Sequence, residues 1–167
     1  MGSAAKAIGV RDYLKTTLET IDGSSTVNAD NGSISHTFNV DLSSSVTLGG
    51  DARAGTAVAA ATIDLEEIRV DPDAGPLGAL LMTGVFIIRV RSKPSANTAE
   101  KRQEAAANAA SDVAAALMQD RSMGGLTREV RLAISARDGD GTEDEWAAGC
   151  GLVVVGIEAD WCNWLGV

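Results

Sequence analysis

The stretch GVFIIRVR, residues Gly84–Arg91, decides the fold expected for this chain of 167 residues. Successive side chains of a strand point to opposite faces. One face of this stretch carries Val85, Ile87 and Arg89, and the other carries Phe86, Ile88 and Val90. Apolar residues on both faces are typical of a strand in the interior of a sheet. We therefore expect a central strand here, preceded by a turn in the DPDAGP segment, residues 71–76.

The segment after this strand is predicted to be a long helix over residues 97–120. Asn97 is its expected N-cap, with Glu100 reaching back to it. Its buried stripe consists mainly of alanines, so the helix should lie very close to the sheet: Ala99, Ala106, Ala109, Ala110, Val113, Ala114 and Leu117. Its solvated side is expected to carry Lys101, Arg102, Glu104 and Asn108. Gly124 and Gly125 should end the segment.

A second helix is predicted near the N-terminus, over residues 4–21. Apolar residues recur there at spacings of three and four, which places them on one face: Ala7, Val10, Leu14, Leu18 and Ile21. Gly23 suits the left-handed residue that follows a last helical turn.

Four other stretches are predicted to be strands. Residues 34–42 alternate with a period of two, which predicts a half-buried strand. Residues 56–70 change register near Asp64, which predicts a bulge or a break. Residues 130–134 and 146–157 are the remaining two. Val46 and Leu48 either continue a strand or belong to a mobile arm, and the Ser, Gly and Asn content of residues 24–56 predicts a flexible arm or a long hairpin.

This order of elements predicts an α+β fold. Strands joined by short turns pair mostly antiparallel, and the N-terminal and long helices should pack on one face of the sheet. The length fits a single domain over residues 1–167.

Composition excludes several classes of function. The net charge is −9, with 14 Lys and Arg against 23 Asp and Glu, so binding to nucleic acid or to an acidic membrane is not expected to be the main role. No run of 18 apolar residues predicts a membrane span, and no signal peptide is predicted. The two cysteines, Cys150 and Cys162, form no disulfide framework and no CxxC pair, which favours a cytoplasmic protein with reduced thiols.

Candidate chemical groups are few. His36 would need a partner to act as a general base, and the sequence indicates none nearby, so we interpret it as structural or solvated. Cys150 lies between two glycines before an apolar run and is interpreted as a small buried residue. The acidic segment 138–145 resembles a calcium loop in outline, but glycine stands at its fourth position rather than its sixth. We expect a solvated hairpin tip, and neither a catalytic residue nor a metal or cofactor site.

Two further groups could serve an interface. Arg89, Arg91 and Lys93 alternate along one strand and are interpreted as a solvated or interface-facing strand edge. Trp161 and Trp164 stand out in a chain with 4% aromatic residues; they either cover the core or anchor a partner.

The segment VAAALMQDRSMGGL, residues 113–126, resembles the end of the long helix in tail-terminator (tail-completion) proteins of long-tailed bacteriophages, where an "al..D.tLGG" run precedes a strand. Met123 stands where that pattern usually has Leu. The order of elements is similar too, including a strand pattern that runs here from Glu67 through Phe86, Ile88 and Val90. The resemblance extends in outline over residues 5–160, whereas residues 24–56 match nothing in it.

The resemblance implies a structural virion protein without enzymatic activity. Such a protein forms a ring of six copies that caps the tail-tube protein, ends tube growth and joins the tail to the head connector, with DNA only as passing cargo. It would be made in the host cytoplasm and end in the virion, at the neck end of the tail. Alternatives are a head-closure, connector or tail-tube subunit of the same particle, or an unrelated α+β enzyme or binding domain.

Overall fold

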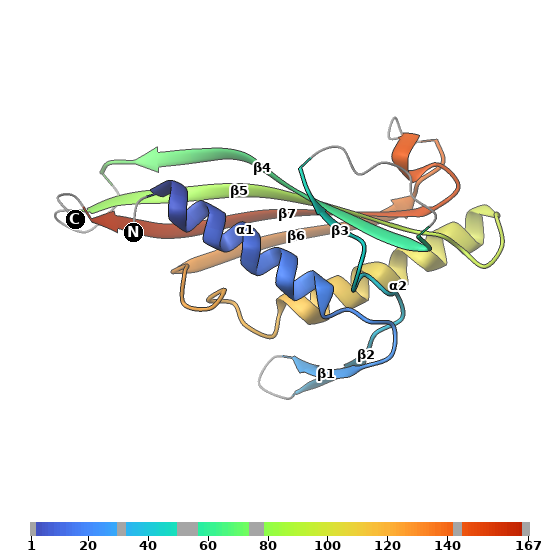
Figure 1. The fold of residues 1–167 in the computed structure, drawn as a ribbon. Coiled ribbons are helices and arrows are strands. Elements are labelled where there is room, and N and C mark those ends of the chain that lie inside the picture. The colour runs from blue at the N-terminus through green and yellow to red at the C-terminus, as the bar shows by residue number, and fades with distance from the viewer. Residues whose placement is uncertain (1–2, 30–32, 50–56, 74–78, 142–144, 165–167) are drawn as a thin grey trace.

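The computed structural model describes residues 3–29, 33–49, 57–73, 79–141 and 145–164. Its two helices are α1 (Ser3–Glu19) and α2 (Ala99–Leu117). A five-stranded sheet has the order β3-β4-β5-β7-β6, and a separate hairpin pairs β1 with β2 (Figure 1). The strands are β1 (Thr26–Ala29), β2 (Ile34–Thr37), β3 (Val46–Leu48), β4 (Ala59–Asp71), β5 (Ala79–Ser92), β6 (Glu129–Asp138) and β7 (Gly151–Trp164). The α+β prediction is confirmed.

Strand β5 is the centre of the large sheet. It pairs antiparallel with β4 on one side and with β7 on the other, so that Ile88 lies between Ile63 and Val155. Phe86, Ile88 and Val90 are fully buried, whereas Val85 and Ile87 on the opposite face are half-buried. The expected interior strand is therefore confirmed, and it has one dry face and one less covered face.

Both helices pack on the dry face of the sheet (Figure 1). The predicted apolar stripe is buried: Ala7, Val10, Leu14 and Leu18 lie on α1, and Ile21 lies just beyond it, because the helix ends at Glu19 rather than at residue 21. These residues share one hydrophobic core with Phe86, Ile88 and Val90 of β5 and with Val113 of α2. Burial of a Leu or Ile side chain contributes about 1.5–3 kcal/mol, so this face of the sheet supplies most of the stability of the fold.

Helix α2 differs from its prediction at its first turn. Thr98, not Asn97, is the N-cap, and its side chain accepts a hydrogen bond from the Lys101 backbone N–H. Asn97 instead accepts from the Arg102 guanidinium at 2.7 Å. Ala99 is exposed, since the turn next to the cap extends beyond the sheet.

The middle of α2 lies very close to the sheet, as its alanines predicted. Ala106 and Ala109 are fully buried, whereas Ala110 and Ala114 are half-buried at the margin of the stripe. A Cβ atom on Gly151 of β7 would lie 2.4 Å from the Ala106 backbone nitrogen, so only glycine fits at this approach.

Three strand predictions need correction or completion. The bulge in β4 is present, as a register shift between Leu65 and Glu67. Val46 and Leu48 belong to β3, which pairs parallel with β4. The alternating stretch 34–42 is a strand only over Ile34–Thr37, because the chain then leaves the hairpin and buries Phe38, Val40 and Leu42 in the core.

The last predicted strand also starts later than expected. Residues Glu145–Ala147 form a short 3-10 helix, and β7 begins only at Gly151. Trp146 lies in this short helix and its ring stacks over Arg91, with the guanidinium carbon 5.2 Å from the ring centre. Of the residues 24–56 predicted to be an arm or a long hairpin, Thr26–Thr37 contains the β1–β2 hairpin, and residues 50–56 lie outside the described part.

The residues that follow α2, from Asp120 to Gly125, form a tight turn. Asp120 accepts hydrogen bonds from the backbone N–H groups of Ser122 and Gly124, at 2.9 and 2.8 Å. The Ser122 hydroxyl also donates to this carboxylate, at 2.6 Å, and this hydrogen bond together with the two backbone contacts holds the pKa of Asp120 below its ordinary value. Met123 takes a left-handed conformation with φ of 49° and is buried, and Gly124 and Gly125 follow with positive φ. The aspartate and the glycines of this motif therefore shape the turn that leads into β6.

Candidate assembly surfaces

The face of the large sheet opposite the helices is its outer face. Neither helix covers it, and the strand registers place on it residues from four strands: Asp64, Glu67 and Arg69 of β4; Thr83, Val85, Ile87 and Arg89 of β5; Val154, Gly156, Glu158 and Asp160 of β7; Glu129, Arg131, Ala133, Ser135 and Arg137 of β6. A domain normally buries its sheet against a second layer. Here that layer covers one face, and half-buried Val85, Ile87 and Val154 lie on the other.

Ion pairs cross the outer face from strand to strand. Arg131 of β6 contacts both Glu158 and Asp160 of β7, at 3.1 and 3.0 Å. On the same face, Arg69 of β4 contacts Glu67 of its own strand at 2.7 Å and Glu158 of β7 at 3.3 Å. Most of these side chains are one-third to one-half exposed, so each pair contributes little to stability in solution.

Asp160 is the most buried carboxylate of this network. Burial raises the pKa of Asp160, but hydrogen bonds from Arg131 and Thr83 outweigh that effect and leave the pKa below its ordinary value. Asp160 therefore stays charged at neutral pH and fixes the Arg131 guanidinium over β7.

The large sheet has two edges without a strand partner in the described part of the chain. Strand β6 pairs only with β7, along all ten of its residues. At the other side, β3 covers β4 only at Ala61–Ile63, so no described strand pairs with β4 from Asp64 to Val70 on that side. Apolar side chains of β4 itself are exposed along this second edge: Leu65 at 38%, Ile68 at 37% and Val70 at 52%.

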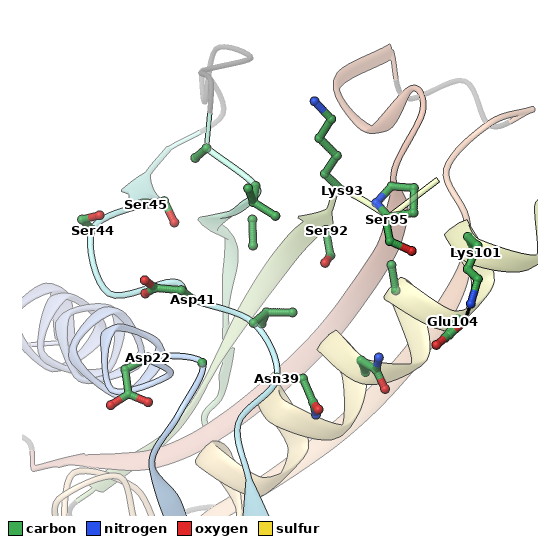
Figure 2. A pocket seen from close by; sticks show the side chains of 18 residues that line it. Asp22, Asn39, Asp41, Ser44, Ser45, Ser92, Lys93, Ser95, Lys101 and Glu104 are labelled. Atoms are coloured by element: carbon green, nitrogen blue, oxygen red, sulfur yellow. Dashed lines mark hydrogen bonds and ion pairs between the residues drawn. The ribbon is translucent and has the colours of Figure 1, made fainter. Parts of the chain in front are cut away.

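A wide groove of about 720 Å³ lies between the loop after β2, the ends of β4 and β5, and α2 (Figure 2). Asp22 and Asp41 lie on the side of α1, and Lys101 and Glu104 on α2 (Figure 2). Hydrogen bonds from the Ser25 side chain and from backbone N–H groups lower the pKa of Asp22 to about 2. Lys101 pairs with Glu104 at 2.7 Å. These charged groups are engaged by their own neighbours, so the groove provides a polar surface rather than a converging set of reactive groups.

Asp112 joins the N-terminal half of the chain to α2. Its carboxylate is fully buried and accepts four hydrogen bonds, of 2.7–3.0 Å: from His36 Nε2, from the backbone N–H groups of Asn39 and Val40, and from Asn39 Nδ2. The sequence indicated no partner for His36 nearby, and the structure supplies one from far along the chain, because Asp112 is 76 residues away. The interpretation of His36 as a structural residue agrees with this tether.

The other predicted residues fall in separate places. Cys150 is 8% exposed, as expected for a small buried residue, and burial raises the pKa of its thiol. Cys162 lies 3.1 Å from the Arg128 guanidinium. Trp161 is 1% exposed and belongs to the core, whereas the side chain of Trp164 lies outside the described part.

The predicted basic strand edge was wrong. Strand β5 is central rather than an edge, and Arg91 is 6% exposed beneath Trp146, whose backbone carbonyl it contacts at 3.3 Å.

The prediction of a solvated hairpin tip was wrong for Asp138, which accepts two hydrogen bonds from Arg102, at 2.6 and 3.1 Å. Arg102 is thereby drawn away from the solvated side of α2, where it was expected.

Residues 142–144 of the acidic segment lie outside the described part. Across the residues that the structure does describe, no group of three His, Cys, Asp or Glu side chains is arranged to hold a metal ion. Nor is any described helix long and apolar enough to cross a membrane.

Comparison of the chain with protein-family models and with curated proteins found no match.

Proposed function

We propose that this chain is a structural subunit of a phage tail, forming a ring that caps the tail tube, stops its growth and joins it to the head connector. The observation that carries the proposal is the single-sided cover of the large sheet: both helices occupy one face, and the outer face and two strand edges are left for contacts with other chains. The resemblance of residues 113–126 to tail terminators supplies the kind of assembly.

The geometry of a ring explains how one protein could end a tube. A head-to-tail contact that closes after a fixed number of copies gives a finite ring rather than a filament. One rim of that ring can match the last ring of tube protein, while the other rim offers no second copy of that surface. In this proposal the ring has six copies.

Charge is consistent with DNA as passing cargo. The net charge of −9 disfavours binding of phosphates, and two arginines of the outer face, Arg69 and Arg131, are paired with carboxylates. We place acidic side chains at least partly along the channel, where a wall that does not bind phosphate lets DNA slide.

Electron microscopy of intact particles tests this proposal. The expected result is one ring of this chain between tube and connector, with acidic side chains facing the channel. Copies along the whole tube would favour a tube subunit, and a ring within the head vertex would favour a connector; either would refute the terminator role. Absence of the chain from particles would refute every virion role, whereas a basic channel would refute only the electrostatic part.

A second test uses purified tube protein, which should grow to a defined length in the presence of the chain. The outer-face variant Val85→Asp, Ile87→Asp should cap tubes poorly if that face contributes to assembly. Ala107→Asp, at an exposed position of α2 and away from the outer face, serves as the control. Thermal unfolding of all variants would separate loss of capping from loss of folding.

A further inference from the structure

We infer that neighbouring copies of this chain join through their free strand edges, with β6 of one copy pairing antiparallel to the Asp64–Val70 edge of β4 in the next. The inference deepens the proposed function, on which it rests for the choice of a second copy as the partner. It names the surface that closes the ring.

Strand directions favour this junction. Along the order β4-β5-β7-β6, every pairing is antiparallel, so β6 runs opposite to β4. Rotation about an axis along the strands leaves strand directions unchanged. When β6 of one copy meets β4 of the next, the alternation therefore continues without a break, and the helices of all copies stay on the same side of the extended sheet.

Charges on the outer face are complementary across the junction. Opposite residues of paired strands share a face of the sheet. If Arg69 of one copy lies opposite Glu129 of the next, then Glu67 lies opposite Arg131, and both pairs combine opposite charges on the same face.

The same register matches apolar residues on the helix side. Ile68, which is 37% exposed, would face half-buried Val130 of the neighbour. The hollow of about 210 Å³ beside Val130, between β6 and the end of α2, would receive apolar side chains from the neighbour's β4 edge. The junction therefore covers the exposed apolar side chains of β4.

Other registers are less favourable. A slip by two residues places Arg69 opposite Arg131 and Asp71 opposite Glu129, two contacts between like charges. A slip by one residue turns Ile68 and Val130 to opposite faces. The bulge between Leu65 and Glu67 and the three residues of β3 limit the length of the junction, so the pairing is fixed rather than sliding.

Charge reversal tests the junction on the purified full chain, with assembly measured by native mass spectrometry and light scattering over a concentration series. Arg69→Glu alone and Glu129→Arg alone should each raise the concentration needed for assembly by about tenfold per junction. An equimolar mixture of the two variants should assemble again, because alternating copies restore a Glu–Arg pair at every junction. Arg137→Glu, the same reversal on β6 but outside the junction, should assemble like the wild type.

Restoration in the mixture cannot arise inside one chain. Three strand spacings separate Arg69 from Glu129 in a single copy, about 14 Å at about 4.8 Å each. The same separation applies to Ile68 and Val130, which is beyond the reach of a disulfide. A chain with Ile68→Cys and Val130→Cys should therefore form disulfides only between copies and give a ladder that ends at the ring size, whereas each single variant should not.

Three results would overturn the inference: Arg69→Glu assembling like the wild type, no restoration in the mixture, or no ladder from the cysteine pair. If rings form in all these cases, self-assembly stands and only the edge junction fails. If the wild type stays monomeric at every concentration and the cysteine pair gives no ladder, the junction fails as well. The tail-terminator role is decided separately, by the position of the chain in particles.

Discussion

Replacement of Asp112 by Ala should release the segment around His36 from α2 and destabilise the whole fold. Four donors lose their shared acceptor, and they differ in their access to water. The Val40 backbone N–H is buried with its residue, so leaving it unpaired costs about 1–3 kcal/mol. The Asn39 groups and the His36 ring are more exposed and can turn to water, at about 1 kcal/mol or less each. Together these terms predict a loss of about 1–6 kcal/mol.

Urea unfolding and amide hydrogen exchange measure the two parts of this effect. The unfolding midpoint should fall, and exchange at Asn39 and Val40 should accelerate more than exchange in β5, because the tether opens before the sheet does. Asp112→Asn keeps one acceptor oxygen but turns an amide N–H towards other donors, so it should fall between Ala and the wild type. Ser111→Ala is the control, since Ser111 is exposed and bonds only the Ala107 carbonyl. An unchanged midpoint together with unchanged exchange at Val40 would refute the tether.

Three further perturbations test the packing and the electrostatics. Ala109→Leu should destabilise the fold by about 1–3 kcal/mol, because Ala109 is fully buried against the sheet. Ala107→Leu, on the exposed side of α2, should change the melting temperature little. Equal melting temperatures for the two variants would show that the buried face of α2 is wrongly assigned. Gly84→Ala should destabilise strongly because the added Cβ would lie 2.8 Å from the Trp161 ring, and thermal unfolding that matches the wild type would contradict this. The hydrogen bond from Arg102 lowers the pKa of Asp138, so the contribution of this carboxylate to folding stability is present above the unfolded value of 3.8 and is lost as pH falls through the lower folded pKa. Asp138→Asn should therefore flatten the loss of stability below about pH 4. An unchanged profile of stability against pH would refute that contribution.

The main elements could be predicted because their local patterns agree with their final environment. The stripe from Ala7 to Ile21 has helical spacing and is buried, and the apolar residues of β5 on both faces correspond to its central place. The change of register near Asp64 corresponds to the bulge in β4. In each case the information lies within one segment, and the surrounding fold reinforces it.

The errors concern contacts between distant segments. Arg91 was read as part of a basic edge because its pairing with Trp146 depends on a turn 55 residues later. Asp112 was overlooked, although an acid within the apolar stripe between Ala109 and Val113 was a signal that something had to satisfy it. The groups that donate to Asp112 lie in the stretch 34–42, which alternates like a strand. Its period of two indicated an extended chain, but not that this chain packs against α2.

The pairing of β5 with β7 over their full lengths has a consequence for synthesis. These neighbours at the middle of the sheet are separated in the sequence by α2 and β6, so β5 emerges from the ribosome long before Gly151–Trp164 can reach it. Until then, β5 is paired with β4 along one edge and has no partner strand along the other. The apolar residues of the β4–β5 hairpin must meanwhile be shielded by the helices or by chaperones. A ribosome that stalls before Gly151 would therefore leave a sheet that lacks an interior strand, β7, rather than an edge strand, and such a species is prone to aggregation and to removal by proteases.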